Sequence, residues 1–158
     1  MKKILYIAAA AFVAITASCA SKTNEAQPAE ENAPVEAAQP AAAPVAQNGT
    51  VIELTNADAV KPGTPVEQLT VIDFNAVWCG PCRQLTPVLE EMAQKYQGKV
   101  TFISVDVDKF GELFEAYNVG QSIPAVVFLS PDGSREDFVG IADLLPADKF
   151  EAIIEKKL

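Results

Sequence analysis

The chain has 158 residues, 49% of them hydrophobic, and a formal net charge of −9 at pH 7. This length allows one ordinary domain and an additional segment, and the acidic balance, without any cluster of Lys and Arg, argues against nucleic acid as a partner. The chain has no histidine, which excludes Ser-His-Asp and Cys-His catalysis, C-x-x-C-H haem attachment and imidazole zinc sites. We expect neither a metal nor a cofactor.

Residues 1–18 have the composition of an export signal. The positively charged Met1-Lys2-Lys3 is followed by an apolar run from Ile4 to Ile15, which is the arrangement of a signal peptide. The run is shorter than the roughly 20 residues that a membrane-spanning helix needs. We therefore expect residues 1–18 to be removed and the rest of the chain to be exported.

The end of this signal resembles the lipobox of bacterial lipoproteins. Thr16-Ala17-Ser18-Cys19 places small residues before a cysteine, with Thr16 where that family usually has an aliphatic residue. The resemblance implies that Cys19 is acylated, and Ala20 rather than Asp after it favours the outer membrane. Several acyl chains would anchor the protein stably. The alternative is ordinary secretory cleavage after Ala20, which discards Cys19.

Residues 19–48 are expected to form a disordered tether. The segment is rich in Ala, Pro, Glu and Gln and has no aromatic residue, so it cannot bury enough apolar area to offset the entropy of ordering. Its repeated prolines oppose helix formation, and its mean reach of about 30 Å would hold a folded domain clear of a membrane. The alternative is a recognition segment that folds on a partner.

Residues 49–158 show the alternating strand and helix patterns of one α/β domain. Nearly continuous apolar runs indicate strands covered on both faces, and apolar residues three and four positions apart indicate helices that pack on a sheet. In chain order we expect a strand at 51–55, a brief helix from Asn56 that stops before Pro62, a strand at 69–74, a helix from near Gln84 to Gly98, a strand at 100–107, a helix at 112–117, and strands at 123–129 and 135–139. A last helix carries Phe150, Ile153, Ile154 and Leu158.

The order βαβαβαββα predicts a mixed sheet flanked by helices. Right-handed crossovers make the first strands parallel, and the turn Pro131-Asp132-Gly133 joins the last two strands as an antiparallel hairpin. Pro124 is expected to open its strand, because an interior strand tolerates proline only at its first residue. Pro87 lies inside the helix that starts near Gln84 and predicts a kink there.

The segment Trp78-Cys79-Gly80-Pro81-Cys82 lies between the apolar run that ends at Phe74 and the helical pattern from near Gln84. This context indicates a strand, a tight turn and a helix, with Cys79 at the start of the helix. Unpaired backbone N–H groups and the positive end of the helix dipole favour a thiolate there. A thiolate, unlike a thiol, attacks sulfur.

These residues resemble the thioredoxin family over the whole of residues 49–158. Trp78-Cys79-Gly80-Pro81-Cys82 matches the family's motif, and Ile123-Pro124 follows it at the family's spacing. Asp73, Pro87 and Gly140 also match. The resemblance implies the thioredoxin fold, with a cis proline at position 124 that faces the two cysteines.

The chain departs from the family pattern at two positions. Asn75 stands two residues after Asp73, where thioredoxins often have an aromatic residue, and Ser104 stands where bacterial members often have a lysine near the aspartate. The loss of that cation would make Asp73 harder to ionise.

The resemblance implies thiol–disulfide exchange through three catalytic residues. Cys79, expected to be the more exposed thiol, attacks a substrate disulfide, and Cys82 then attacks Cys79 and releases the reduced substrate. Asp73 would be a buried carboxyl group with a raised pKa that takes the proton from Cys82. The alternatives are a structural disulfide for the cysteines and an ordinary surface aspartate at the end of a strand.

The other matching positions are expected to bind substrate. Trp78 would offer a flat apolar face beside Gly80 and Pro81, although it could also be a core residue. Ile123 and Pro124 would pair by their main chain with an extended substrate segment, and Gly140 belongs to the same set.

The function predicted from the sequence and this resemblance is that of a periplasmic thioredoxin, a monomer that reduces disulfides in exported proteins. Gly-Pro between the cysteines is typical of the reducing members. A membrane thiol transporter is the expected electron donor, because a cytosolic reductase cannot reach an exported domain. The alternatives are an oxidase or isomerase on the same fold and a non-catalytic peptide-binding or holdase module.

Overall fold

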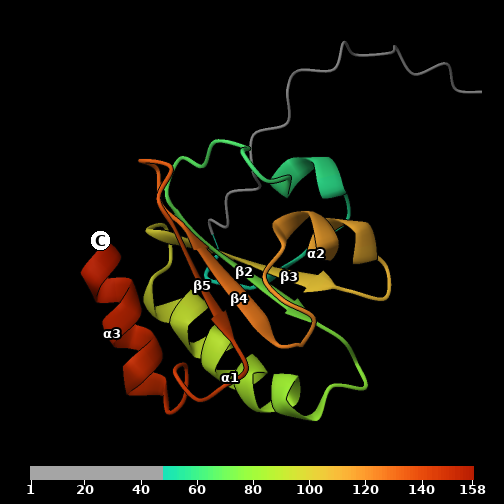
Figure 1. Cartoon of the computed structure of the whole chain (residues 1–158). Helices are drawn as coiled ribbons and strands as arrows, with labels where there is room; N and C mark the ends of the chain where they lie inside the picture. The colour runs from blue at the N-terminus through green and yellow to red at the C-terminus, as the bar shows by residue number, and fades with distance from the viewer. Residues whose placement is uncertain (1–47) are drawn as a thin grey trace, which may run out of the picture. The chain divides into compact units, whose positions relative to one another are not determined.

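The computed structural model describes residues 48–158, which form a five-stranded mixed sheet with helices on both faces (Figure 1). The elements in chain order are β1 (Ile52–Glu53), the 3-10 helix η1 (Ala57–Val60), β2 (Leu69–Asn75), α1 (Gly80–Lys95), β3 (Val100–Asp106), α2 (Gly111–Tyr117), β4 (Ala125–Leu129), β5 (Arg135–Val139) and α3 (Ala147–Lys157). The predicted βαβαβαββα order is confirmed. The predicted signal peptide and the tether up to residue 47, including Cys19, lie outside the described residues.

The strands are arranged in the order β1-β3-β2-β4-β5. β3 pairs in parallel with β1 and β2, whereas β4 pairs antiparallel with both β2 and β5. The parallel pair β2 and β3 is connected through α1, which is the crossover that parallel neighbours need. The hairpin between β4 and β5 turns where predicted, with a hydrogen bond of 2.9 Å from the N–H of Gly133 to the carbonyl oxygen of Ser130.

Side chains of β2 alternate between two cores, one on each face of the sheet. Leu69 and Val71 pack in a cluster with residues of α1 and α3, and Ile72 and Phe74 pack in a second cluster with residues of η1 and α2. Because successive strand residues point to opposite faces, Asp73 belongs to the face of Leu69 and Val71. The sheet therefore places this carboxyl group under α1.

Three details differ from the sequence predictions. α1 begins at Gly80 rather than near Gln84, because Cys79 caps the helix and a proline suits its first turn, where no apolar repeat is needed. β4 begins at Ala125, one residue after Pro124. Leu158 was predicted to lie in the last helix, but α3 ends at Lys157, and Leu158 lies outside the helix and is 56% exposed.

α1 runs without interruption through Pro87. Between residues 48 and 158, no helix combines the length and the apolar character that crossing a membrane requires.

Candidate active site

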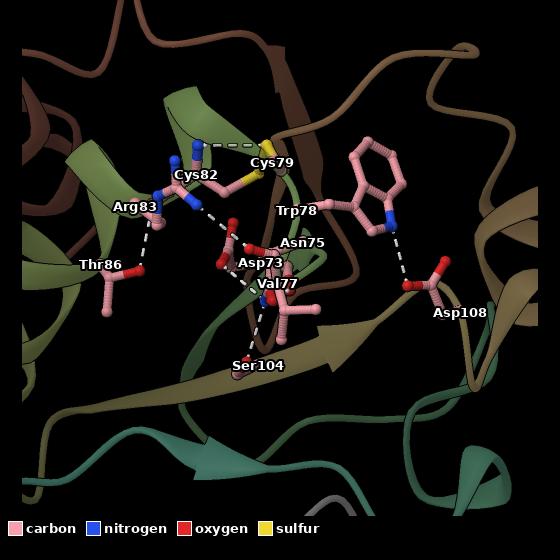
Figure 2. The surroundings of a disulfide bond; sticks show 10 residues. All are labelled: Asp73, Asn75, Val77, Trp78, Cys79, Cys82, Arg83, Thr86, Ser104 and Asp108. Carbon is pink, nitrogen blue, oxygen red and sulfur yellow. Dashed lines mark hydrogen bonds between the residues drawn. A yellow bond between two sulfur atoms is a disulfide. The ribbon is translucent and has the colours of Figure 1, made fainter.

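Cys79 and Cys82 are joined by a disulfide at the N-terminus of α1, with their Cα atoms 5.3 Å apart (Figure 2). Cys79 is the N-cap residue and has an extended backbone conformation. The backbone N–H of Cys82 lies 3.2 Å from Sγ of Cys79 and donates a hydrogen bond to it. After reduction, the same N–H and the positive end of the helix dipole are available to stabilise a thiolate on Cys79.

The local charges also favour an anion at the start of α1. The first turn has no acidic residue, and the guanidinium of Arg83 donates a 3.4 Å hydrogen bond back to the carbonyl oxygen of Val77. A cation at a helix N-terminus is unfavourable for the helix itself. Arg83 was not among the predicted site residues, and its unfavourable position directly after the second cysteine is the signal that could have revealed it.

Cys79 was expected to be the more exposed cysteine, but in this disulfide form both cysteines are buried and differ little in exposure. Cys79 is 4% exposed and Cys82 is 3% exposed. The reason is that the two cysteines pack together with Ala76, against the partly buried Val107 and Ile123. What distinguishes the two cysteines is their place in the chain, since Cys79 caps the helix and Cys82 lies inside it.

An exposed apolar surface borders this buried disulfide. Trp78 is 63% exposed and the preceding Val77 is 81% exposed, so the alternative of Trp78 as a core residue is wrong. The indole N–H of Trp78 donates a 2.8 Å hydrogen bond to Asp108 (Figure 2). This bond holds the indole beside the motif. Asp108 was missed because it lies thirty residues away along the chain, and only the fold brings it to Trp78.

The loop before β4 forms the second border of the disulfide. The Ile123–Pro124 peptide bond is cis, and Ile123 packs against the cluster that contains both cysteines. The carbonyl oxygen of Pro124 accepts a 2.8 Å hydrogen bond from the N–H of Gly140, whose φ of 81° suits glycine. The structure thus brings Ile123, Pro124 and Gly140 together, and Ile123 packs against the cluster of the two cysteines.

Asp73 is a buried carboxyl group on the face of the sheet covered by α1. It is 4% exposed, so it is not the surface aspartate of the alternative interpretation. Burial raises the pKa of Asp73 to about 7, a hydrogen bond from Asn75 lowers it, and the negative charge of Glu53 raises it. Near neutral pH such a group can both accept and donate a proton.

The two departures from the family pattern lie next to this carboxyl group. Ser104 is the β3 residue in register with Asp73. The side-chain amide of Asn75 donates to Oδ2 of Asp73 at 3.0 Å and to Oγ of Ser104 at 2.9 Å (Figure 2). A neutral amide, from the position where the family often has an aromatic residue, therefore contacts the carboxyl group, and the serine that stands in the lysine position accepts a hydrogen bond from that amide.

In the described part of the chain, no group of three or more carboxylate or thiol side chains is placed to hold a metal ion. The chemistry that the geometry allows is exchange between thiols and disulfides at the Cys79–Cys82 pair, and Asp73 lies among the residues that surround this pair (Figure 2).

Comparison with known proteins supports this chemistry. The thioredoxin family model matches residues 52–156. A thioredoxin of Borreliella burgdorferi is 41% identical over 85 residues, which cover 54% of this chain and 69% of that protein. An H-type thioredoxin of Oryza sativa subsp. indica is 40% identical over 98 residues, which cover 60% of this chain and 78% of that protein.

Solved structures of thioredoxins are also similar to this chain. A mutant thioredoxin from Halobacterium salinarum superposes with a TM-score of 0.59 at 29% identity, covering 72% of this chain and 96% of the other. The germline-specific thioredoxin Deadhead from Drosophila melanogaster has a TM-score of 0.51 at 36% identity, covering 58% of this chain and 83% of the other. The matched residues contain the sheet, α1 and both cysteines, so the chain belongs to the thioredoxin family and is a thiol–disulfide oxidoreductase.

Proposed function

We propose that this oxidoreductase reduces disulfides in exported proteins in the periplasm, held at the outer membrane by a lipid on Cys19. The sequence of residues 1–18, with a charged start and an apolar run before Cys19, supports export. Gly80 and Pro81 between the cysteines support the reducing direction, because the family's reducing members have this pair. The observation that carries the proposal is the disulfide at the N-terminus of α1, in a chain whose residues 1–18 have the composition of an export signal.

The reaction transfers two electrons from the Cys79–Cys82 dithiol to the substrate. The Cys79 thiolate attacks one sulfur of a substrate disulfide, forms a mixed disulfide and releases the other sulfur as a thiolate. Cys82 loses its proton to Asp73, and its thiolate attacks Sγ of Cys79. The second substrate thiolate leaves, both substrate sulfurs take up protons, and the enzyme is left with the Cys79–Cys82 disulfide.

Trp78 and the loop at Ile123 are the proposed substrate-binding surface. Within the described residues, neither the backbone N–H nor the carbonyl oxygen of Ile123 has a backbone hydrogen-bond partner. An extended substrate segment would pair with these groups, as peptides do at an exposed sheet edge. The indole of Trp78, with Gly80 and Pro81 beside it, would cover the apolar part of that segment.

The oxidised enzyme needs a dithiol donor on the same side of the membrane. A membrane thiol transporter that passes electrons from the cytoplasm would supply them by exchange with the Cys79–Cys82 disulfide. The donor is oxidised to its own disulfide, and the enzyme returns to the dithiol form.

Trapping of mixed disulfides in cells tests the proposal. Cys82→Ala removes the resolving thiol, so substrates should stay covalently attached to Cys79 and be identified by mass spectrometry as exported proteins. The matched control is the double variant Cys79→Ser, Cys82→Ala, which should trap nothing. Trapping of cytoplasmic proteins would contradict the periplasmic location.

The anchor has its own test. In cell fractions, the mature chain should lie in the outer membrane with an acylated N-terminal Cys19, and Cys19→Ser should abolish that modification. A soluble mature chain that begins after Ala20 would support secretory cleavage instead.

The direction of electron flow is tested by the reduction potential. A value of about −270 mV is found for a thioredoxin, and about −120 mV for a strongly oxidising enzyme of this kind. A potential near the second value would replace the reductase by the oxidase. Retention of activity in Cys79→Ser would instead support a non-catalytic peptide-binding module.

A further inference from the structure

The amide of Asn75 makes the two oxygens of the Asp73 carboxyl group different. It donates to Oδ2 at 3.0 Å and to the backbone carbonyl oxygen of Asp73 at 3.2 Å. A backbone carbonyl can only accept, so the group that faces it must be the NH₂ of Asn75. Oδ1 of Asp73 is buried and has no hydrogen-bond partner in the described part of the chain.

Ser104 fixes the amide in this orientation. Its Oγ lies 2.9 Å from Nδ2 of Asn75, and the register of β2 and β3 places Ser104 directly beside Asp73. The NH₂ group is thus held between β2 and β3. An amide with partners on both strands cannot rotate away from Oδ2 without losing hydrogen bonds at a partly buried site.

A cavity of about 370 Å³ adjoins the same carboxyl group, with Asp73, Asn75 and Ser104 in its wall. Across from the sheet, Thr86 of α1 lines the cavity, and its hydroxyl donates a 3.1 Å hydrogen bond to the carbonyl oxygen of Cys82. The space can hold several water molecules, since each occupies about 30 Å³ in the liquid. It lies between the buried carboxyl group and the surface, because the wall also includes exposed residues.

We propose that Asn75, anchored by Ser104, is a positioning residue that keeps Oδ2 of Asp73 as a hydrogen-bond acceptor and leaves Oδ1 to take the proton of Cys82 and release it into this cavity. In the step itself, the S–H bond of Cys82 breaks and an O–H bond forms at Oδ1, which leaves a thiolate and a neutral carboxyl group. The carboxyl group then returns the proton to water in the cavity. This step transfers only a proton, and no atom changes its oxidation state.

The charges around Asp73 define the expected pH dependence. The charged side chains in the cavity wall are Glu53 from β1 and Glu90 from α1, both acidic and exposed, while β3 contributes the neutral Ser104. Burial raises the pKa of Asp73 to about 7, and the Asn75 hydrogen bond opposes this shift. Loss of the amide therefore raises the pKa further, because only acidic groups remain nearby.

The test uses the purified full chain and the variant Asn75→Leu, which has a similar size but no donor. In the oxidised protein, the midpoint of the Asp73 carboxyl titration, followed by carbon NMR, should rise by about one pH unit. Asp73→Asn identifies the signal. At pH 7 the ionised fraction of Asp73 would fall about five-fold, so resolution of a mixed disulfide by Cys82 should slow by about five-fold. The fluorescence of Trp78, the chain's single tryptophan, can follow that step.

Ser104 provides the matched pair of variants. Ser104→Ala removes the anchor and should shift the midpoint in the same direction by less, and Ser104→Thr keeps the hydroxyl and should restore the wild-type value. A midpoint that does not rise in Asn75→Leu would overturn the proposal. So would a rate that falls by the same factor at every pH, which is the result expected of a purely structural residue.

Discussion

Asp73 and Phe74 are neighbours on β2, yet the two faces of the sheet give them opposite surroundings. Phe74 is fully buried, with its ring centroid 5.3 Å from that of Phe114 and 5.2 Å from that of Tyr117. The hydroxyl of Tyr117 is itself satisfied by a 2.6 Å hydrogen bond to the carbonyl oxygen of Val60. On the other face, Asp73 lines a cavity, and its Oδ1 has no hydrogen-bond partner among the described residues.

The side chains on one face of β2 contribute to stability, whereas Asp73 on the other face contributes to the chemistry. Close-packed aromatic rings contribute apolar burial and favourable ring contacts, whereas a buried carboxyl oxygen without a partner destabilises the fold by about 1–3 kcal/mol. The chain keeps this destabilising group next to its disulfide. Substitutions on the two faces should therefore change different measurements.

The largest effect is expected at the disulfide. Cys79→Ser removes the nucleophile, so reduction of a model disulfide such as that of insulin should fall by at least about a thousand-fold. The urea midpoint of the variant should match that of the reduced wild-type protein, because the two differ by one buried atom. Substantial remaining turnover would show that the chemistry does not depend on Cys79.

The second effect is the pH dependence of stability that Asp73 causes. The pKa of Asp73 is about 7 in the folded protein and 3.8 in the unfolded reference, so between these values the folded state holds a proton that the unfolded state lacks. The stabilisation from this proton is complete below pH 3.8 and is lost as the pH rises through 7, by up to about 4 kcal/mol. Asp73→Asn should remove this loss, as measured by urea unfolding at pH 5 and pH 8. If the free energy of unfolding changed equally between pH 5 and pH 8 in the wild-type protein and in the variant, that result would contradict the raised pKa.

The third effect concerns the face of the sheet on which Phe74 is packed. Phe74→Ala should lower the free energy of unfolding by about 3–5 kcal/mol, because it leaves a cavity among buried rings. The conservative Phe74→Leu should lose less. If the two faces are independent, the midpoint of the Asp73 titration stays unchanged in the folded variant; a shift of that midpoint would show that the faces are coupled through β2.

The smallest effect is expected at the edge of the disulfide. Asp108→Ala removes the acceptor of the Trp78 indole N–H, and the loss of one exposed hydrogen bond should change stability by less than about 1 kcal/mol. The indole should become more accessible to a fluorescence quencher, and reduction of a protein substrate should slow by a few-fold. Asp143→Ala, an exposed aspartate in another loop, is the control, and an equal response of both variants would argue against a role for this bond.

Much of this architecture could be predicted from local patterns. Apolar runs at β2 and β3 and the helical repeat after Cys82 have strong periodicity, so the order of elements and the position of the motif follow from them. The start of α1 was predicted too late, because its first turn contains a cap and a proline rather than apolar residues. The burial of both cysteines could not be predicted, because their packing against Ala76, Val107 and Ile123 depends on the tertiary structure.

The amino-acid sequence by itself determined the family, the redox pair Cys79 and Cys82, and the place of Asp73 in a central strand, because these depend on residue types and spacings along the chain. Only the tertiary structure decided which groups meet that pair. Asp108 reaches Trp78 across thirty residues, and Ser104 reaches Asn75 across twenty-nine. Such contacts depend on strand register and on the crossing of α1 over the sheet. Neither of these can be predicted from a local stretch of residues.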